Sequence, residues 1–447
     1  MPDHPIVRVI TDQQDAFALL TRRHGFEGTN LSDSARQGIR RIFGQDLSAS
    51  QVVDLILEEV RTGGDEAVRS LTARIDGGSP ESLEVPKSAW EMAYAGLEPA
   101  LQDALQTAAS QIASFHEKQN EHPGSITTTR VLWVNWCDHW NASVYAPGGT
   151  AVYPSSLLMT AIPARVAGVG EIIVCSPPHS GVVSPLILAA AWVARVDRLF
   201  QIGGAQAIAA MAYGTETVPH VDKILGPGNI FAVLAKRKVF GVVDIDQLPG
   251  PTETLIVADA SADPRLTAAD MIAQAEHDAM ASAILVTTSA ALADAVQNEL
   301  ETQLESLPRG DIALASPQTN GLIIIAEDVP VAMDLANCYA PEHLCLLLAD
   351  PWSAVPLVRH AGGIFVGEHS PEALGDYTAG PSHVMPTGGT ARFSSPIHLN
   401  DFVKVISIAA ANTKAIKRLG PATIALANAE GLHGHARAIE YRLESMD

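Results

Sequence analysis

A glutamate and a histidine stand side by side in the stretch "NCYAPEHLCLLL", residues 337–348, as Glu342 and His343. Both residue types commonly transfer protons in enzymes. Pro341 disfavours a helical backbone at the residue before it, so a helix preceding the pair must end there. On a regular strand the two side chains would face opposite ways, whereas an irregular turn after the proline lets both converge on one cleft. A capped helix end without chemistry is the alternative interpretation.

Further polar groups suited to metal binding or proton transfer lie in the same half of the chain as Glu342 and His343. Gln274 and His277, in "QAEHD", are three residues apart and would share one face of a helix. That spacing is compatible with a metal site, and also with an exposed helix end. Asp376 in "GDY" and His383 in "SHV" belong to a long loop, where an aspartate is most often a turn or cap residue.

The segment "EGLHGHARAIEYR" carries Glu430, His433 and His435 near the C-terminus. Residues two apart on a helix point in different directions, so at most one of the two histidines can serve a given site. A solvated helix without ligand contacts explains the same pattern.

Glycine-rich turns occur where strands are expected to end and helices to begin. They are "PGGT" (147–150), "IGGAQA" (202–207) and "GPGN" (226–229). Backbone N–H groups in such turns collect anions, including the phosphates of nucleotides. However, no Gly-x-Gly-x-x-Gly follows an expected strand, so these residues alone leave nucleotide binding open.

The elements that must position these groups alternate between strand and helix. Residues 48–113 are expected to be helical, with Ser50 as a candidate cap and Gly63 and Gly64 ending the first helix. From about Tyr145 to 240, and again from 253 to 367, short apolar strands alternate with helices. This rhythm is typical of parallel sheets covered on both faces, and its recurrence predicts two α/β units.

Composition narrows the kind of partner. The chain has 447 residues, 29 Lys and Arg against 50 Asp and Glu, and a formal charge of −21. So acidic a surface repels phosphate backbones, which excludes nucleic acid as the expected partner. The N-terminal stretch has neither a basic start nor an apolar core, and no stretch is long enough to span a bilayer. With four scattered cysteines, these features predict a cytoplasmic protein with buried free thiols and no membrane contact.

Taken together, the motifs resemble those of the histidinol dehydrogenase family. They are "YAPGGTAVYPSSLLMTAIPARVAGV", "QIGGAQAIAAMAYGTE", "KILGPGN", "QAEH", "APEHL", "GDY" and "MPTGGTARFSSP", in the order and spacing of that family. The resemblance covers nearly the whole chain. It implies an NAD- and zinc-dependent homodimeric enzyme that oxidises L-histidinol to L-histidine through an aldehyde, with two NAD, as the last step of histidine biosynthesis.

The resemblance also implies an architecture. The fold class is α/β, with two incomplete Rossmann-like domains and small helical extensions at both ends. We expect an N-terminal extension at 1–40, a first domain from 41–145 together with 253–397, and a second, NAD-binding domain at 146–252. Residues 398–447 are expected to reach the partner subunit.

The family's functional residues can be placed on matching motifs. The resemblance makes Glu342 and His343 the catalytic pair. The remaining assignments are zinc ligands at Gln274, His277, Asp376 and His435; substrate contacts at these four and at Thr252, His343, His383 and Glu430; and NAD contacts at Tyr145, Gln206 and Asn229.

Two other functions fit the same residues. One is an NAD-dependent oxidation of another small alcohol, such as a sulfonated propanediol. Glu430 and His383 argue against it, because a sulfonate would favour cations there. The other is a zinc hydrolase that uses Glu342 as base without a nucleotide. Thr252 stands where the family usually has serine, which keeps the hydroxyl but adds a methyl group to the pocket.

Overall fold

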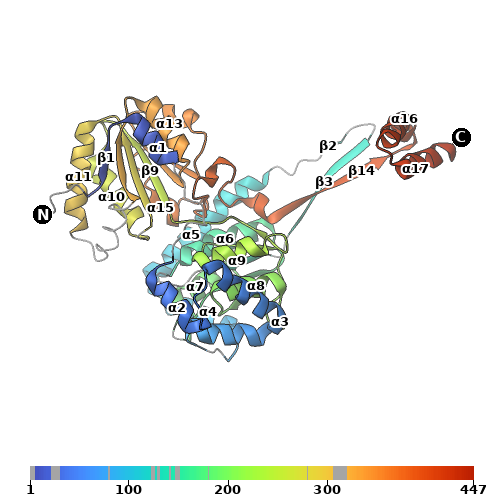
Figure 1. The fold of residues 1–447 in the computed structure, drawn as a ribbon, viewed down its shortest axis with the longest axis horizontal. Coiled ribbons are helices and arrows are strands. Elements are labelled where there is room, and N and C mark those ends of the chain that lie inside the picture. The colour runs from blue at the N-terminus through green and yellow to red at the C-terminus, as the bar shows by residue number, and fades with distance from the viewer. Residues whose placement is uncertain are drawn as a thin grey trace.

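Two parallel β-sheets form the body of the protein, and a long arm carries the C-terminal helices away from them (Figure 1). The computed structural model describes residues 6–21, 31–78, 81–121, 126–127, 131–139, 142–145, 152–179, 181–278, 280–305 and 320–446. The expected α/β class with two parallel-sheet units is confirmed.

The five-stranded sheet has the strand order of a Rossmann half. Its strands are β4 (Ala142–Tyr145), β5 (Ile172–Cys175), β6 (Arg198–Phe200), β7 (Lys223–Leu225) and β8 (Asp244–Ile245). They lie in the order β6-β5-β4-β7-β8, all parallel. Counted along the chain this is 3-2-1-4-5, so the winding direction reverses between β4 and β7, which is where such folds bind their ligands.

The six-stranded sheet repeats that order and adds one strand. It contains β1 (Arg8–Ile10), β9 (Glu253–Ala258), β10 (Ser282–Thr287), β11 (Leu322–Ile325), β12 (His343–Leu347) and β13 (Gly363–Val366), ordered β1-β11-β10-β9-β12-β13. From β9 to β13 the order is again 3-2-1-4-5. The N-terminal segment thus contributes an edge strand, β1, and the helix α1 (Gln13–Thr21), which packs on α13 (Val329–Tyr339).

The central strands of each sheet are buried on both faces because they are largely apolar. In β9, Leu255 and Val257 face one cluster of buried side chains while Ile256 and Ala258 face another. The five-stranded sheet divides its side chains between two clusters in the same way. This period of two follows from strand geometry, and it explains why the sequence shows continuous apolar runs here.

The expected grouping of residues 41–145 with the six-stranded sheet is wrong. This segment forms α2 (Asp33–Phe43), α3 (Ala49–Asp76), α4 (Lys87–Ala95) and α5 (Pro99–Glu117), and its last strand, β4, is the centre of the five-stranded sheet. The helices pack on that sheet's own helices, namely α6 (Pro154–Ala167), α7 (Pro185–Val193), α8 (Gly204–Tyr213) and α9 (Ile230–Val239). A parallel sheet needs cover on both faces, and the N-terminal helices complete that cover.

The six-stranded sheet is covered by helices from its own crossovers. These are α10 (Pro264–Ala275), α11 (Ala290–Leu304), α13 and the short α14 (Pro351–Ala354), while α15 (Glu372–Tyr377) follows the last strand. The sequence predicts this succession of strands and helices up to Gly367, whereas α15 lies in a segment that it predicts to be a loop.

The sequence suggests that helix α3 ends at Gly63 and Gly64, but the helix does not end there. It continues to Asp76 through a kink at Gly64, whose φ of 54° favours glycine. A Cβ at Gly64 would lie 2.5 Å from a carboxylate oxygen of Glu216, so a larger residue would have to displace that carboxylate. Ser48, not Ser50, caps the helix, with Gln51 completing a capping box.

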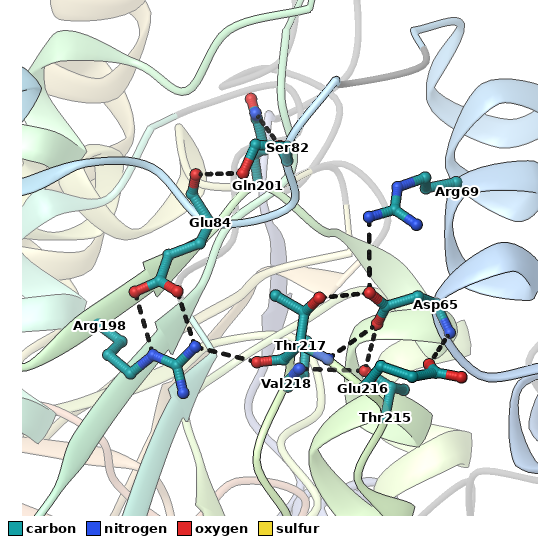
Figure 2. Close-up of polar contacts among 10 residues, drawn as sticks. All are labelled: Asp65, Arg69, Ser82, Glu84, Arg198, Gln201, Thr215, Glu216, Thr217 and Val218. Carbon is teal, nitrogen blue, oxygen red and sulfur yellow. Dashed lines mark hydrogen bonds and ion pairs between the residues drawn. The ribbon is translucent and has the colours of Figure 1, made fainter.

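Hydrogen bonds to Asp65 connect the kink of α3 to the loop between α8 and β7 (Figure 2). Its carboxylate accepts hydrogen bonds from the hydroxyls of Thr215 (2.6 Å) and Thr217, and from the Thr217 N–H. Its own N–H donates to Glu216 at 2.8 Å. Arg198, held in a two-pronged ion pair by Glu84, donates to the Thr217 carbonyl at 3.0 Å and extends the network.

The arm is antiparallel. Strand β14 (Val403–Ala411) pairs with β3 (Val131–His139), which also pairs with β2 (Ile126–Thr127). Beyond it, α16 (Thr413–Ala429) and α17 (His433–Glu444) pack on each other at the far end (Figure 1). Large apolar side chains of these helices are exposed: Leu419, Leu426, Leu432 and Tyr441.

Within the described residues, no helix has the length and apolar character that crossing a membrane requires. Cys175 and Cys345 are buried free thiols, as expected.

We predict that Asp65→Ala destabilises the fold, because it leaves two threonine hydroxyls and an N–H without their acceptor. The free energy of unfolding should fall by about 2 kcal/mol or more, measured by urea denaturation. Asp46→Ala is the control, since Asp46 only forms an exposed ion pair with Arg40 and its loss should change little. Equal stability of both variants would contradict the role given to Asp65.

Candidate active site

The turn before β12 brings Glu342 and His343 to the amino edge of the six-stranded sheet. Helix α13 ends at Tyr339, as Pro341 predicts, and Ala340 takes a left-handed conformation with φ 52°. A non-glycine residue is strained there, and such strain persists only where surrounding packing enforces it. Ala340 is fully buried, and the turn at this residue directs the side chains of Glu342 and His343 to the start of β9.

Glu342 is held by two hydrogen bonds. Its Oε2 accepts from the Thr252 hydroxyl at 2.6 Å and from the Glu253 N–H at 3.0 Å. Burial raises the pKa of this carboxyl to about 7, and the nearby His343 and these two donors only partly offset the effect. Near neutral pH the group can therefore both accept and donate a proton.

His343 has one nitrogen engaged and the other available. Its Nδ1 lies 3.3 Å from the Glu253 carbonyl, an acceptor, so Nδ1 carries the hydrogen. Its Nε2 is buried and has no hydrogen-bond partner among the described residues. This tautomer leaves the Nε2 lone pair free, which is the state a general base requires.

Gln274 extends the same chain of contacts. Its Nε2 donates to the Thr252 hydroxyl at 2.8 Å, while its Oε1 is buried without a partner in the described structure. The sequence suggests that His277 shares a helical face with Gln274. Helix α10 ends at Ala275, however, so His277 lies just past the helix. Its N–H still returns to the Gln274 carbonyl, which keeps the two residues together.

Asp376 lies on α15, not in a loop as the sequence predicts, and His383 follows in the loop beyond that helix. The His383 Nδ1 donates to the backbone carbonyl of Asp376 at 2.8 Å, and its Nε2 accepts from the Ser156 hydroxyl at 3.1 Å. Burial lowers the pKa of His383, and the charge and backbone carbonyl of Asp376 oppose this effect only in part. Positive charge on the nearby His343 or His277 would lower the pKa further.

Ser156 shows how the two sheets meet. It lies in the first turn of α6, after the carboxyl edge of the five-stranded sheet, yet it contacts a residue at the amino edge of the other sheet. Two further bonds cross between the sheets, from Gln247 to the Met385 carbonyl and from the Gly250 N–H to Thr387. Sequence reasoning missed Ser156, because nothing in "YPSS" indicates a partner 227 residues away.

The reversal point of the five-stranded sheet gathers the three expected nucleotide contacts. Tyr145 ends β4, and its hydroxyl accepts from the Gly204 N–H at 2.9 Å. Gln206 lies in the first turn of α8, and Asn229 caps α9 by accepting from two N–H groups. A Cβ on Gly226 would lie 2.2 Å from the Tyr145 carbonyl oxygen, so glycine is required for this close approach.

Glu430 and His435 do not join the site within one chain. Both are exposed near the junction of α16 and α17, at the far end of the arm (Figure 1). No group of three or more histidine, cysteine or acidic residues suited to a metal occurs among the described residues. Within one chain, His277 and Asp376 both lie near His383 and Gln274 is bonded to His277, whereas His435, the fourth expected ligand, lies on the arm.

The residues present nevertheless fit the implied cofactors. An unpartnered amide oxygen, an imidazole and a carboxylate are donors that zinc accepts. At the other edge, the Oε1 of Gln206 is buried without a partner in the described part of the chain, beside a helix start that lacks a side-chain cap. The N–H groups at a helix start without a side-chain cap suit the phosphates of a dinucleotide.

Fold and site define an α/β enzyme in which a buried glutamate and histidine lie side by side at the amino edge of a parallel sheet. The histidinol dehydrogenase family model matches residues 41–443. The chain is 49% identical to the histidinol dehydrogenase of Deinococcus radiodurans over 96% of its length and 98% of the relative's. It is also 49% identical to that of Thermus thermophilus, over 90% and 97%.

A crystal structure gives the same result for the fold. Histidinol dehydrogenase from Elizabethkingia anophelis superposes with a TM-score of 0.90 at 32% identity, covering 99% of both chains. The chain belongs to the histidinol dehydrogenase family and is an oxidoreductase.

Proposed function

We propose that the protein oxidises L-histidinol to L-histidine through L-histidinal, reducing two NAD, as the last step of histidine biosynthesis in the cytoplasm. The observation that carries the proposal is the continuous chain of contacts from Gln274 through Thr252 to Glu342, with His343 beside it. It joins a candidate zinc ligand directly to the proton-transfer pair. The family relationship supports the substrate.

His343 is the base for the alcohol step. Its Nδ1 donates a hydrogen bond to the Glu253 carbonyl, which orients Nε2 to take the proton of the substrate hydroxyl. The hydride leaves from the carbon that bears this hydroxyl. When bound, NAD accepts the hydride, and zinc orients the substrate by ligation. Gln274, His277 and Asp376 would hold the zinc, and Tyr145, Gln206 and Asn229 would hold the dinucleotide.

Glu342 serves the aldehyde step. An aldehyde must add water before it can lose a second hydride, and a carboxylate can take the proton of that water. The pKa of about 7 places Glu342 where it can accept this proton and then release it. Thr252 and the Glu253 N–H aim the carboxylate, and His383 and Thr252 contribute substrate contacts.

We further propose a homodimer whose active sites each draw on both chains. The exposed arm supports this, because Glu430 and His435 stand on it far from their own site, next to exposed apolar side chains of α16 and α17. A large exposed apolar surface is typical of an interface. In a two-fold dimer the arm of each subunit would supply His435 as a zinc ligand and Glu430 as a substrate contact to the other.

The stoichiometry of NADH tests the reaction. Two NADH should form per L-histidinol consumed, with histidine as the product, measured by absorbance and chromatography. The sulfonated propanediol serves as comparison substrate and should give little turnover. One NADH per histidinol, with aldehyde released, would contradict the proposed role of Glu342.

Substitution should separate the two members of the catalytic pair. Glu342→Gln should slow oxidation of supplied histidinal far more than the alcohol step, and His343→Asn should slow both. Below about pH 7 Glu342 is protonated and cannot accept a proton, so the wild-type aldehyde step should rise through that pH. This rise of the aldehyde oxidation rate with pH should be absent in Glu342→Gln. If the rise persists in that variant, the group that titrates is not Glu342.

Mixed dimers test the shared site. His277→Asn and His435→Asn are each expected to be inactive, and the two chains are co-expressed with different tags. A mixed dimer then holds one site with both substitutions and one with neither. If half the dimers are mixed, about a quarter of wild-type activity should return. Purified mixed dimers without activity would show that each site is built within one chain.

A further inference from the structure

The expected acidic residue of a Rossmann-type site is missing from its usual place. Sheets of the order 3-2-1-4-5 that bind NAD commonly place an Asp or Glu after the second strand, where it accepts hydrogen bonds from a ribose. The second strand here is β5, which ends at Cys175. The residues after it, "SPPHSGVVSP" (176–185), contain no acidic side chain.

Another carboxylate reaches the same edge of the sheet from a different element. Asp76 is the last residue of α3, the helix that packs along α8. Its Oδ2 accepts from the Nε2 of Gln206 at 3.2 Å. The residue before α8, Gly203, lies against the loop that follows β5, since a Cβ there would be 2.4 Å from the Cβ of Pro177. Asp76 therefore stands close to where β5 ends.

This carboxylate has unused capacity to accept hydrogen bonds. It forms no ion pair with any basic side chain in the described part of the chain, and the Gln206 amide is a neutral donor. Burial raises the pKa of Asp76 to about 6, so the group is mostly ionised at neutral pH despite being half-buried. A carboxylate with about four lone-pair positions, one of them used, is suited to a pair of vicinal hydroxyls.

Its neighbours belong to the proposed coenzyme site. Gln206 keeps a buried Oε1 without a partner among the described residues, and the Tyr145 hydroxyl lies at the start of the same helix. Burial raises the pKa of Tyr145 to about 12, and the charge of the nearby Asp76 adds to this effect. Asp76, Gln206 and Tyr145 thus lie together at the carboxyl edge of the sheet.

We propose that Asp76 selects the coenzyme: its carboxylate accepts hydrogen bonds from ribose hydroxyls of NAD and repels a ribose that carries a phosphate. The proposal rests on the NAD-dependent function proposed above. It makes α3, which precedes the Rossmann-ordered strands in the chain, the source of the acidic group that such folds usually take from the end of their second strand.

A purely structural role for Asp76 would have a different signature. If the carboxylate only orients Gln206, Asp76→Asn should be silent, because the asparagine oxygen can still accept the bond from Gln206. If it binds the ribose, the same substitution removes the charge that strengthens that contact and excludes the phosphate.

The test compares Asp76→Asn and Asp76→Ser with the wild type, using NAD and NADP at saturating histidinol. The KM for NAD should rise about tenfold in both variants, as for loss of one charge-assisted hydrogen bond, with kcat changed less than about twofold. The ratio of kcat/KM for NADP to that for NAD should rise about tenfold or more.

Asp54→Asn is the matched control. Asp54 lies on the same helix, and its removal changes the net charge equally, but it is exposed and pairs with Lys238 of α9. It should leave both coenzyme constants unchanged. Folding of every variant is checked by thermal denaturation, and NAD binding is also measured directly by calorimetry.

The outcomes separate the two proposals. If the wild type reduces neither coenzyme with histidinol, the proposed function fails. If the wild type uses NAD while the folded Asp76 variants keep its KM, its calorimetric affinity and its preference over NADP, the role of Asp76 alone is overturned.

Discussion

The active site depends on the hydroxyl of Thr252, which donates to one side chain and accepts from another. It donates to Glu342 and accepts from Gln274, so it joins the start of β9, the turn before β12 and the end of α10. A buried carboxylate without such donors would be costly, and a misplaced one would not face His343. Serine could make the same two bonds, whereas the extra methyl of threonine restricts the side-chain rotation and fixes the hydroxyl.

Most of the fold could be predicted because its signals are local. Apolar runs next to segments of helical periodicity gave most strands of both sheets, but not β1, β4 or β8, and Pro341 gave the end of α13. The assignment of residues 41–145 failed because it depended on which sheet the N-terminal helices cover, and every helix here has an apolar face that would suit either. Likewise Gly64 marks a kink rather than an end, since the packing of both halves of α3 on one sheet outweighs the local interruption.

The site was predictable to the extent that motifs name residues. Motifs named Glu342, His343 and their surroundings, and the turn at Ala340 provides the irregular geometry that brings both side chains to the start of β9. They did not give Ser156 or Asp76, which contact the site from segments far away in the chain. Long-range pairing of this kind leaves no periodicity or spacing in a single sequence, so only the folded structure reveals it.

The opposite edges that the two sheets present to each other, joined by the bond between Ser156 and His383, differ in electric polarity. At the carboxyl edge of the five-stranded sheet, α6, α8 and α9 begin, and their N-termini carry partial positive charge. At the amino edge of the six-stranded sheet, α10 and α13 end, and their C-termini carry partial negative charge. A cation is favoured on one side and phosphates on the other. Negative charge that moved from the edge of the six-stranded sheet to that of the five-stranded sheet would travel towards the more positive potential.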